Sequence, residues 1–479
     1  MLKEGETTDS TAFLCSPFLI FWFCCMISYP MSKERKTMHI ILLSGGSGKR
    51  LWPLSNDVHS KQFLQIMDDQ KGHTESMVQH MARRIRETIP SALITIATSK
   101  NQVSELKHQL GNDIEVSAEP ERKDTLGAII LATSMLKEKY KLSDDEAVVV
   151  VPVDAEAGEE YFKSLVKLYD LAKNGDANLY LLGIHPTYAT EKYGYILPKT
   201  EEDIASVDVF QEKPDLQHAE LYIKKGALWS AGVYAFKVGY MMKKAHAMVE
   251  FKDHQDLLDR YTKLLNISFA FSIAEREPSV KVLKIHEHWA DLGTWNTLTE
   301  AMKDDKIGNV VMGPNNENTH VINSLAIPVM VFGTKDLIVA SSPDGILVSS
   351  KEGSRGIKPY VSKLDEPIRF AEKSWGQYQV IDLAEDCHTI KATLRKGHQM
   401  SYHSHQWRDE TWTIVTGKGR VCLDGVIRDV GPGDVIIMNH GKKHTIRALT
   451  DLVLIEVQIG RDIDEDDKQK FPLDQNLDY

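Results

Sequence analysis

A glycine-rich segment at 44–50 has the residue types of a phosphate-binding loop. It follows an apolar, partly β-branched run at 40–43, which is typical of a strand buried on both faces. Glycines let a backbone turn tightly and bring its N–H groups against a ligand, and nearby cations neutralise phosphate oxygens. The residues that offer this chemistry are Gly45, Gly46, Gly48, Lys49, Arg50 and Lys61. The segment therefore predicts a loop that holds a nucleoside triphosphate.

Two common phosphate loops do not fit the spacing of this segment. A P-loop requires Gly-x-x-x-x-Gly-Lys-Ser/Thr, but Arg50 follows Lys49 here. A dinucleotide fingerprint requires a third glycine where Leu51 stands. A plain turn between two strands is the alternative, but it leaves Arg50, Lys61 and the segment 52–54 without a role.

Two aspartates far apart in the sequence have the chemistry of a divalent-cation site. Asp154 directly follows the apolar run at 147–153, and Asp291 lies within the segment 289–295. A carboxylate just past a buried strand, at the edge where ligands bind, is well placed for a hard cation such as Mg²⁺. For Asp154 alone, a helix N-cap or turn role is equally compatible. We expect the two carboxylates together to share one Mg²⁺ ion that bridges the phosphates.

A second group of ligand-type residues lies near the end of the chain. His403 and His405 are two positions apart, so on a strand they point to the same face, and Glu410 can return beside them. His444 supplies a fourth ligand from a later segment. Imidazoles with one carboxylate suit Zn²⁺, Fe²⁺, Mn²⁺ or Ni²⁺, and residue identity does not choose among these ions. Histidines scattered on a surface strand are the alternative, but the spacing of the two motifs favours a metal site.

Alternating strands and helices are expected to position the first site. Short apolar runs alternate with amphipathic segments, which indicates an α/β fold with a doubly wound, mostly parallel sheet. In such a sheet ligands bind at the carboxyl ends of the strands, where the glycine loop falls. We expect strands at 40–43, 92–98, 147–153 and 178–184, and helices at 76–88, 126–140 and 161–173.

A length of 479 residues indicates several domains. We expect a leader at 1–37, an α/β domain at 38–305, a small β connecting domain at 306–365 and an all-β domain at 366–479. The connecting domain shows no chemical constellation, so packing or dimerisation is its expected role. The apolar stretch at 18–27 is shorter than the roughly 20 residues that span a bilayer, and it lacks the features of a signal peptide. We interpret the leader as non-native or mis-assigned and non-structural, with a weak membrane anchor as the alternative.

The composition narrows the classes of partner. The chain has 68 acidic and 57 basic residues and a net charge of −11, which argues against a broad nucleic-acid-binding face. Three of the five cysteines lie in the leader, and only Cys387 and Cys422 follow it. This usage excludes a disulfide scaffold and favours a reducing, cytoplasmic setting. We expect neither nucleic acid nor a membrane as a partner, and we expect a homo-oligomer.

The glycine loop and the residues after it resemble the signature of the sugar-nucleotide pyrophosphorylases, in particular the mannose-1-phosphate guanylyltransferases. Ser60 replaces the family's proline, and the matching positions are Gly45, Gly46, Gly48, Arg50, Leu51, Trp52, Pro53, Leu54, Ser55, Lys61, Gln62 and Phe63. The family's Trp-x-Asp-x-Gly-x-Trp is intact around Asp291, and its Pro-x-Asp is present at Asp154, with Ala155 in place of histidine. The resemblance implies a Rossmann-like nucleotide-diphospho-sugar transferase fold in which Asp154 and Asp291 bind Mg²⁺.

Further segments carry the same resemblance. The segment 119–125 resembles the family's base-recognition segment, but Lys123 and Asp124 replace arginine and asparagine, and Gly127 stands where proline is usual. Segments 193–196, 210–214 and 229–232 resemble its sugar-binding turn, Phe-x-Glu-Lys-Pro and Trp-Asn-Ser-Gly motifs, with Ser230 in place of asparagine. The resemblance implies catalytic roles for Arg50, Lys61, Asp154 and Asp291, nucleotide binding by Gly45, Gly46, Gly48, Lys49, Arg50, Lys123 and Asp124, and sugar-phosphate binding by Gly194, Glu212, Lys213 and Ser230.

The C-terminal segment resembles the cupin metal site, with Asn439 in place of a proline. The resemblance implies an all-β cupin barrel whose metal ligands are His403, His405, Glu410 and His444. More narrowly, segments 373–378, 455–460 and 465–467 resemble the type II phosphomannose isomerase domain that is often fused to the guanylyltransferase. Arg408 is a possible isomerase residue, whereas Thr411 replaces a histidine and leaves the proton-transferring base unidentified.

These observations predict a Mg²⁺-dependent mannose-1-phosphate guanylyltransferase of polysaccharide biosynthesis. It would convert GTP and α-D-mannose 1-phosphate into GDP-mannose and diphosphate, with a divalent transition metal in the cupin. One alternative is a bifunctional enzyme whose cupin also interconverts fructose 6-phosphate and mannose 6-phosphate. Another is a nucleotidyltransferase for a different hexose 1-phosphate, with a non-catalytic sensing or assembly cupin. Ser230 and the pair at 123–124 leave the hexose and the nucleotide open.

Overall fold

The structure is a computed structural model that describes residues 37–46, 48–69, 71–364, 367–461, 463 and 467–472. The chain separates into two units, Met1–Thr37 and Met38–Tyr479, and every element below belongs to the second. The expected leader, apart from Thr37, lies outside the described residues, as do Ser47 and the acidic pair at 465–466. No helix in the described part of the chain is long and apolar enough to cross a membrane.

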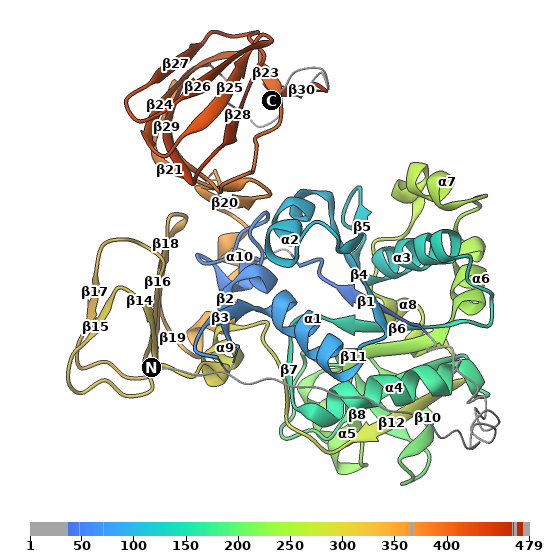
Figure 1. Cartoon of the computed structure of the whole chain (residues 1–479). Coiled ribbons are helices and arrows are strands. Elements are labelled where there is room, and N and C mark those ends of the chain that lie inside the picture. The colour runs from blue at the N-terminus through green and yellow to red at the C-terminus, as the bar shows by residue number, and fades with distance from the viewer. Residues whose placement is uncertain are drawn as a thin grey trace, which may run out of the picture. The chain divides into compact units, whose positions relative to one another are not determined.

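A mixed sheet forms the centre of the first domain (Figure 1). Within the described residues it has nine strands, in the order β5-β4-β1-β6-β11-β8-β12-β10-β9. Their bounds are β1 Met38–Leu43, β4 Ala92–Ser99, β5 Glu115–Glu119, β6 Ala147–Pro152, β8 Leu179–Ile184, β9 Tyr195–Pro198, β10 Ile204–Gln211, β11 Leu228–Lys237 and β12 Val280–Ile285.

Parallel pairing dominates only one half of this sheet. β1 is parallel to β4 and β6, and β4 is parallel to β5, as the alternation of strands and helices predicts. β11 instead runs antiparallel to β6 and β8, and β10 runs antiparallel to β9 and β12. Residues 199–203 join β9 to β10, and this link is too short for the crossover that parallel neighbours require. The sheet is therefore mixed, and the expected parallel arrangement holds from β5 to β6.

Helices cover both faces of the sheet and bury two apolar cores (Figure 1). Ile40 of β1 faces one core and Ile41 faces the other, so both faces of the strand are buried and its sequence is continuously apolar. The first core packs against α1 Met77–Thr88, α2 Val103–Leu110, α4 Glu159–Asn174 and α5 Leu216–Lys224, and the second against α3 Asp124–Tyr140, α6 Val238–Met248, α7 His254–Asp259 and α8 Phe269–Ser272. The expected strands and helices are confirmed to within two residues at each end.

Short elements at the edge of the sheet complete the first domain. A two-stranded antiparallel ribbon joins β7 to β13, and another joins β2 to β3. α1 begins at a capping box in which the side chain of Ser76 accepts from the N–H of Gln79, and the Gln79 side chain accepts from the N–H of Ser76. The remaining bounds are β2 Gln65–Asp68, β3 Thr74–Ser76, β7 Ala155–Ala157, β13 Trp289–Asp291 and α9 Trp295–Ala301.

The connecting domain consists of two small sheets. β14, β16 and β18 are parallel with β19 antiparallel on β18, and β15 is parallel to β17. Ile322 and Ile338 of this domain share one buried cluster with Leu51, next to the glycine loop, and with Leu292, next to Asp291. The bounds are β14 Lys306–Gly308, β15 Val310–Met312, β16 His320–Asn323, β17 Val329–Val331, β18 Leu337–Ser342, β19 Gly345–Ser350 and α10 Lys358–Val361.

The C-terminal domain is built from two antiparallel sheets. Their strand orders are β20-β21-β22-β29-β24-β27 and β26-β25-β28-β23-β30, which agrees with the predicted cupin barrel. Trp412 and Ile414 of β24 and Ile446 of β28 belong to the buried core of this domain. The bounds are β20 Phe370–Lys373, β21 Gly376–Ala384, β22 Cys387–Leu394, β23 His403–His405, β24 Arg408–Thr416, β25 Gly419–Leu423, β26 Val426–Val430, β27 Val435–Met438, β28 His444–Ala448, β29 Leu452–Gly460 and β30 Lys468–Lys470.

Candidate functional site

The glycine loop follows β1 and is held by side chains from three other segments. The carbonyl oxygen of Gly46 accepts from Ser60 Oγ at 2.9 Å, from Gln102 Nε2 at 3.2 Å and from Arg122 Nη2 at 3.3 Å. Gly48 has φ +57°, and a Cβ there would lie 2.4 Å from the carbonyl oxygen of Asn56. No described residue accepts a hydrogen bond from the N–H groups of Gly45, Gly46 or Gly48. The loop is therefore held in place through the Gly46 carbonyl, and its glycine N–H groups are available to bind an anion.

Asp154 and Asp291 are brought together by the β7–β13 ribbon. Asp291 is paired with Ala155 across the ribbon, and the N–H of Leu292 donates to the carbonyl of Asp154 at 2.9 Å. Lys61 forms ion pairs with both carboxylates, a short one with Asp154 and one of 3.8 Å with Asp291. A Cβ on Gly293 would lie 2.7 Å from Asp291 Oδ1 and 3.1 Å from Lys61 Nζ. A side chain at 293 would therefore displace the Asp291 carboxylate or the Lys61 ammonium from their present positions.

Burial and mutual charge act on the pKa values of this triad in opposite directions. Burial alone would lower the pKa of Lys61, but the two carboxylates outweigh burial and raise that pKa. Burial would raise the pKa of Asp154, but Lys61 holds it below its ordinary value. Burial and the charge of Asp154 raise the pKa of Asp291, even though Lys61 opposes this shift. Asp291 is thus the carboxylate with the less complete charge compensation.

Lys123 and Asp124 of the predicted base-recognition segment contact other residues of the protein. Lys123 Nζ pairs with Glu121 at 2.8 Å and donates to the carbonyl of Thr262 at 2.9 Å. Asp124 has φ +57° and accepts from the N–H of Thr125 at 2.7 Å. Lys123 thus contacts both its own segment and residue 262, Asp124 contacts its neighbour Thr125, and their binding of the nucleotide stays a prediction.

Glu119 begins the predicted base-recognition segment, but its contacts beside the glycine loop were not predicted from the sequence. It is buried at the end of β5, its Oε2 lies 3.5 Å from a Cβ built on Gly45, and its Oε1 accepts from the hydroxyl of Tyr261. A Cβ on Gly127 would lie 2.6 Å from that hydroxyl, which explains glycine where the family has proline. Burial raises the pKa of Glu119 to about 7. Residues 119 and 261 are far apart in the sequence, so no local pattern predicts their contact.

We expect Glu119→Gln to stabilise the protein more at pH 8 than at pH 5. The folded pKa of about 7 lies above the ordinary value of 4.5, so folding favours protonated Glu119. The contribution of protonated Glu119 to the stability of the wild type is lost as the pH rises from 4.5 to 7. Because glutamine does not ionise, its advantage over glutamate should grow by about 2–3 kcal/mol between the two pH values. Urea unfolding of both proteins checks this, with exposed Glu202→Gln as the control, and an equal difference at both pH values contradicts it.

The predicted sugar-phosphate residues converge around Gly194. A Cβ on Gly194 would lie 2.7 Å from Glu212 Oε2 and 3.4 Å from Ser230 Cβ, and Ser230 N donates to the carbonyl of Gly194 at 2.8 Å. Lys213 Nζ pairs with Glu212 Oε1 at 2.8 Å, and its side chain is half exposed. Trp229 contacts Tyr193 edge-on, with ring centroids 5.0 Å apart. These residues combine polar groups that can bond sugar hydroxyls with aromatic rings that can pack against a sugar ring.

The predicted C-terminal metal ligands form a buried cluster. The ligand atoms of His403, His405, Glu410 and His444 all lie within 4.8 Å of one another. His403 faces His444 across the β23–β28 pair. Nδ1 of His403 lies 2.7 Å from the carbonyl of Ser401, and Nδ1 of His444 lies 2.9 Å from that of Lys442. These carbonyls accept from Nδ1 and leave each Nε2 lone pair for a metal ion.

Further charged groups lie beside this cluster. Arg408 Nε donates to Glu410 Oε1 at 3.1 Å, and Arg408 Nη2 lies 3.3 Å from His405 Nε2. Gln458 Nε2 bridges Glu410 Oε1 and Glu456 Oε1. Burial and the charge of Glu410 raise the pKa of Glu456 to about 8. The sequence analysis named Arg408 as a candidate residue, whereas Glu456 entered it only as part of the segment 455–460, and its contact with the cluster was not predicted.

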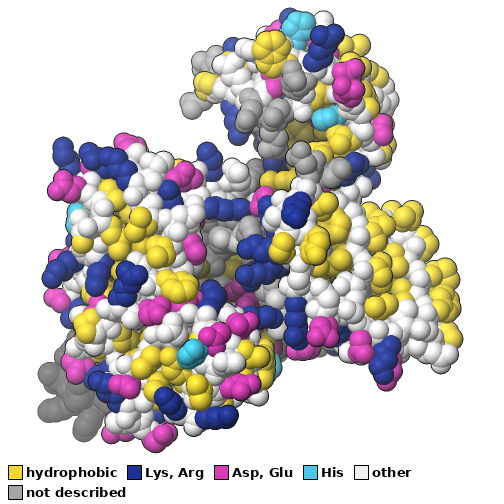
Figure 2. Space-filling view, turned by 180° about the vertical axis from the view of Figure 1, so that it is seen from behind, with side chains coloured by type: hydrophobic (Ala, Val, Ile, Leu, Met, Phe, Trp, Pro, Cys, Tyr) yellow, Lys and Arg dark blue, Asp and Glu magenta, His cyan; other side chains and the backbone are white. Residues whose placement is uncertain are grey.

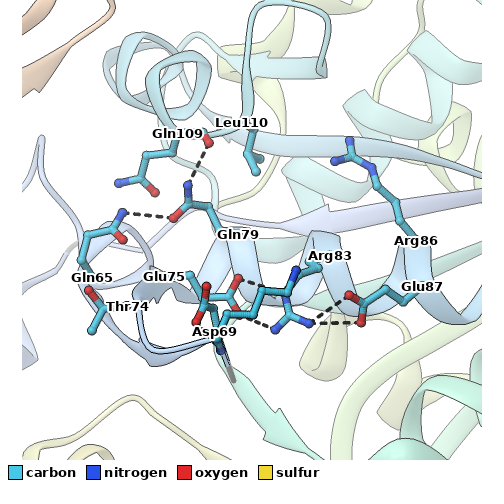
Figure 3. Close-up of a pocket in the computed structure, with 11 residues that line it drawn as sticks. Gln65, Asp69, Thr74, Glu75, Gln79, Arg83, Arg86, Glu87, Gln109 and Leu110 are labelled. Atoms are coloured by element: carbon cyan, nitrogen blue, oxygen red, sulfur yellow. Dashed lines mark hydrogen bonds and ion pairs between the residues drawn. The ribbon is translucent and has the colours of Figure 1, made fainter.

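A pocket of about 540 Å³ lies elsewhere on the first domain (Figure 3). Arg83 bonds both Glu75 and Glu87 in this pocket, whereas Lys71 and Arg86 form no ion pair with a described carboxylate. Gln65 donates to Gln79, which in turn donates to the carbonyl of Gln109. None of the predicted site residues lines this pocket.

An α/β sheet whose edge carries a glycine loop, a lysine and two facing carboxylates defines an enzyme of the nucleotide-binding class. Residues 39–307 match the family model described as nucleotidyl transferase, and residues 365–472 match the one described as mannose-6-phosphate isomerase C-terminal. Because the first match covers more than half of the chain, the chain belongs to the nucleotidyl transferase family.

Its relatives include proteins of similar length. The mannose-1-phosphate guanylyltransferase of Escherichia coli K12 is 27% identical over 91% of this chain and 98% of the relative. The xanthan biosynthesis protein XanB of Xanthomonas campestris pv. campestris is 26% identical over 90% of this chain and 97% of the relative. A solved structure described as mannose-1-phosphate geranyltransferase from Thermus thermophilus is 26% identical, with a TM-score of 0.57, and covers 69% of this chain and 100% of its own.

Proposed function

We propose that the chain catalyses the reaction of GTP with α-D-mannose 1-phosphate to give GDP-mannose and diphosphate. The observation that carries this proposal is the meeting of Asp154 and Asp291 at Lys61. The guanylyltransferase names of relatives that align with about nine-tenths of the chain support the choice of nucleotide and hexose.

The proposed reaction is an in-line displacement at phosphorus. An oxygen of the sugar 1-phosphate forms a bond to the α-phosphorus of GTP, the bond from that phosphorus to the bridging oxygen breaks, and pyrophosphate leaves with the bonding electrons. The N–H groups of the glycine loop hold the triphosphate. Arg50 and Lys61 stabilise the negative charge that builds on the phosphoryl oxygens. Glu212 accepts from sugar hydroxyls and Lys213 pairs with the sugar phosphate.

The acidic pair fits a Mg²⁺ ion. Asp291 Oδ1 is buried and makes no hydrogen bond within the described residues, and carboxylate oxygens are preferred ligands of Mg²⁺. Asp154 and Asp291 would hold the ion, which, when bound, neutralises and orients phosphate oxygens. In the cupin, the buried cluster of three imidazoles and one carboxylate fits Zn²⁺, Fe²⁺, Mn²⁺ or Ni²⁺.

A substrate panel tests the proposed reaction. The full chain is incubated with each of the four ribonucleoside triphosphates and with mannose, glucose and galactose 1-phosphates, and pyrophosphate release is followed. We expect the highest kcat/KM for GTP with mannose 1-phosphate. A faster reaction with another pair would reassign the substrates, and no release with any pair would refute the transferase proposal.

We also propose a second activity, the interconversion of fructose 6-phosphate and mannose 6-phosphate in the cupin. Aldose–ketose isomerisation requires a proton-transferring group near a metal or cation that polarises the carbonyl. Glu456 is linked through Gln458 to the metal cluster, and Arg408 lies inside the same cluster. A coupled assay on the full chain, loaded in turn with each candidate metal, tests this. Silence with every metal rejects the second activity.

We further propose that the chain forms a homo-oligomer through its connecting domain. Several large apolar side chains of this domain are more than half exposed, among them Ile327, Met330, Phe332, Ile346 and Val348. Elsewhere on the face shown in Figure 2, charged side chains of both signs are interspersed. Light scattering of the full chain should give more than one chain per particle, and Ile346→Ser with Val348→Ser should reduce this number. A monomeric parent protein contradicts the proposal.

A further inference from the structure

Three cations near the acidic pair have no carboxylate partner. Arg50, Lys192 and Arg355 make no ion pair with any described carboxylate. Arg50 lies in the turn that follows the glycine loop, and Lys192 precedes Tyr193, whose ring lies 5.2 Å from that of Trp289 in the strand that ends at Asp291. Burial and the charge of Arg355 lower the pKa of Lys192, whereas the charges of Asp291 and Glu300 oppose this shift. Cations that form no ion pair are available to neutralise a bound polyanion.

Arg355 belongs to the connecting domain, not to the domain that carries the glycine loop. It lies in the short helical turn Gly353–Gly356, which packs against α9, and the next element, α10, packs against the turn Lys49–Leu51 of the loop. With its amide turned so that donors meet acceptors, Asn296 accepts from Arg355 Nη2 at 3.3 Å through its side-chain oxygen and donates to the carbonyl of Lys351. Asn296 follows Asp291 by five positions and thus links the guanidinium to the acid-bearing segment.

The connecting domain is anchored directly on the segment that follows the loop. Ser342 Oγ donates to the carbonyl of Pro53 at 2.6 Å, and Asn56 Nδ2 donates to Asp344 at 2.7 Å. A Cβ on Gly345 would lie 2.5 Å from the ring of Trp52. These contacts and the buried cluster around Ile338 anchor the connecting domain, and with it the turn that carries Arg355, on the segment that follows the loop.

We propose that Arg355, with Lys192, binds the β- and γ-phosphates of the nucleotide and the pyrophosphate that leaves. This inference rests on the proposed function, in which Lys213 already pairs with the phosphate of the sugar substrate. Lys49, the other cation of the loop, faces Asp57 at 3.9 Å, so Arg50 alone would meet the polyphosphate from the loop side. The guanidinium of Arg355 offers a fork of N–H donors that matches phosphate oxygens. The connecting domain thereby completes the polyphosphate site.

Binding of inorganic pyrophosphate tests this assignment independently of turnover. Calorimetry on the full chain with Mg²⁺ compares wild type with Arg355→Ala, Arg355→Gln, which can still bond Asn296, and Arg355→Lys. We expect Kd to rise about 10- to 100-fold in the alanine and glutamine variants and to recover in part with lysine. Lys335→Ala serves as the control, because Lys335 is an exposed cation of the same domain that pairs with Glu317.

The reverse reaction, from nucleotide sugar and pyrophosphate, separates the two ends of the site. In Arg355→Ala the KM for pyrophosphate should rise about 10-fold or more, while the KM for the nucleotide sugar stays within about twofold. An unchanged Kd for pyrophosphate, or a defect confined to the KM of the nucleotide sugar, overturns the assignment. If the wild type binds pyrophosphate through Arg355 but forms no nucleotide sugar from any pair, the transferase proposal fails and the binding assignment stands.

Discussion

Asp291→Asn is expected to lower the kcat of GDP-mannose formation about 10³-fold. The amide keeps the shape of the carboxylate but removes the charge that faces Lys61 and that would hold the metal ion. Losing one preorganised electrostatic contact to a reacting phosphoryl group typically costs about 10²- to 10³-fold in rate. Because the substitution would lower the affinity for Mg²⁺ and also shift the position of the bound ion, we expect the upper end of that range. Steady-state kinetics at saturating GTP and sugar phosphate, over a series of Mg²⁺ concentrations, measure the loss.

The same substitution should leave folding intact or improve it. Burial and Asp154 raise the pKa of Asp291, so its ionised form is disfavoured in the folded protein at neutral pH. A neutral amide removes this unfavourable charge, and we expect an unchanged or higher unfolding midpoint. Asp176→Asn is the control, since Asp176 is an exposed acid in an ion pair with Lys281. A wild-type rate in Asp291→Asn, or a rate loss explained by unfolding, contradicts the catalytic assignment.

Glu410→Gln is expected to lower the metal affinity of the cupin by at least about 100-fold. Glu410 is the one carboxylate among the four clustered ligands of the described chain, and it is almost fully buried. Burial lowers the pKa of His405 to about 4, so this ring is neutral at pH 7 and can act as a ligand. Without Glu410, a divalent ion would be bound in a buried site whose remaining three ligands are neutral imidazoles. Even outer partners of metal ligands contribute about 10- to 100-fold in affinity, so a ligand itself should contribute no less.

Elemental analysis after dialysis provides the measurement. The wild type should retain about one transition metal per chain at pH 7, whereas Glu410→Gln should retain almost none. Glu385→Gln, at an exposed acid of the same domain, is the control. Guanylyltransferase rates should be the same in all three proteins if the two sites work independently. Full metal content in Glu410→Gln would exclude Glu410 as a ligand.

Much of the fold and the outline of both sites follow from local sequence patterns. The run at 147–153 is apolar because both faces of β6 are buried, so its position and the place of Asp154 just beyond it could be predicted. The spacing of His403 and His405 placed them on one strand face, and the structure brings them together with Glu410 and His444. These features follow from the two-residue period of a strand, and a short stretch of sequence is enough to reveal this period.

Contacts between distant, non-periodic segments could not be predicted in this way. The hydrogen bond from the Lys123 ammonium to the carbonyl of Thr262 is one such contact, because no local pattern relates the two segments. The Glu119–Tyr261 pair and the Arg355–Asn296 pair each join segments whose proximity follows from packing of whole domains. The antiparallel insertion of β11 likewise depends on how the chain returns to the sheet, which apolar periodicity does not encode.

Anomalous diffraction from Mn²⁺ in crystals with a non-hydrolysable GTP analogue gives the most direct test of the transferase site. Mn²⁺ replaces Mg²⁺ and can be located without reference to the surrounding density. We predict a peak within bonding distance of both Asp154 and Asp291, with the phosphates of the analogue against the N–H groups of Gly45, Gly46 and Gly48. Mn²⁺ bound away from both carboxylates, or a triphosphate seated elsewhere on the sheet, would contradict the site described above.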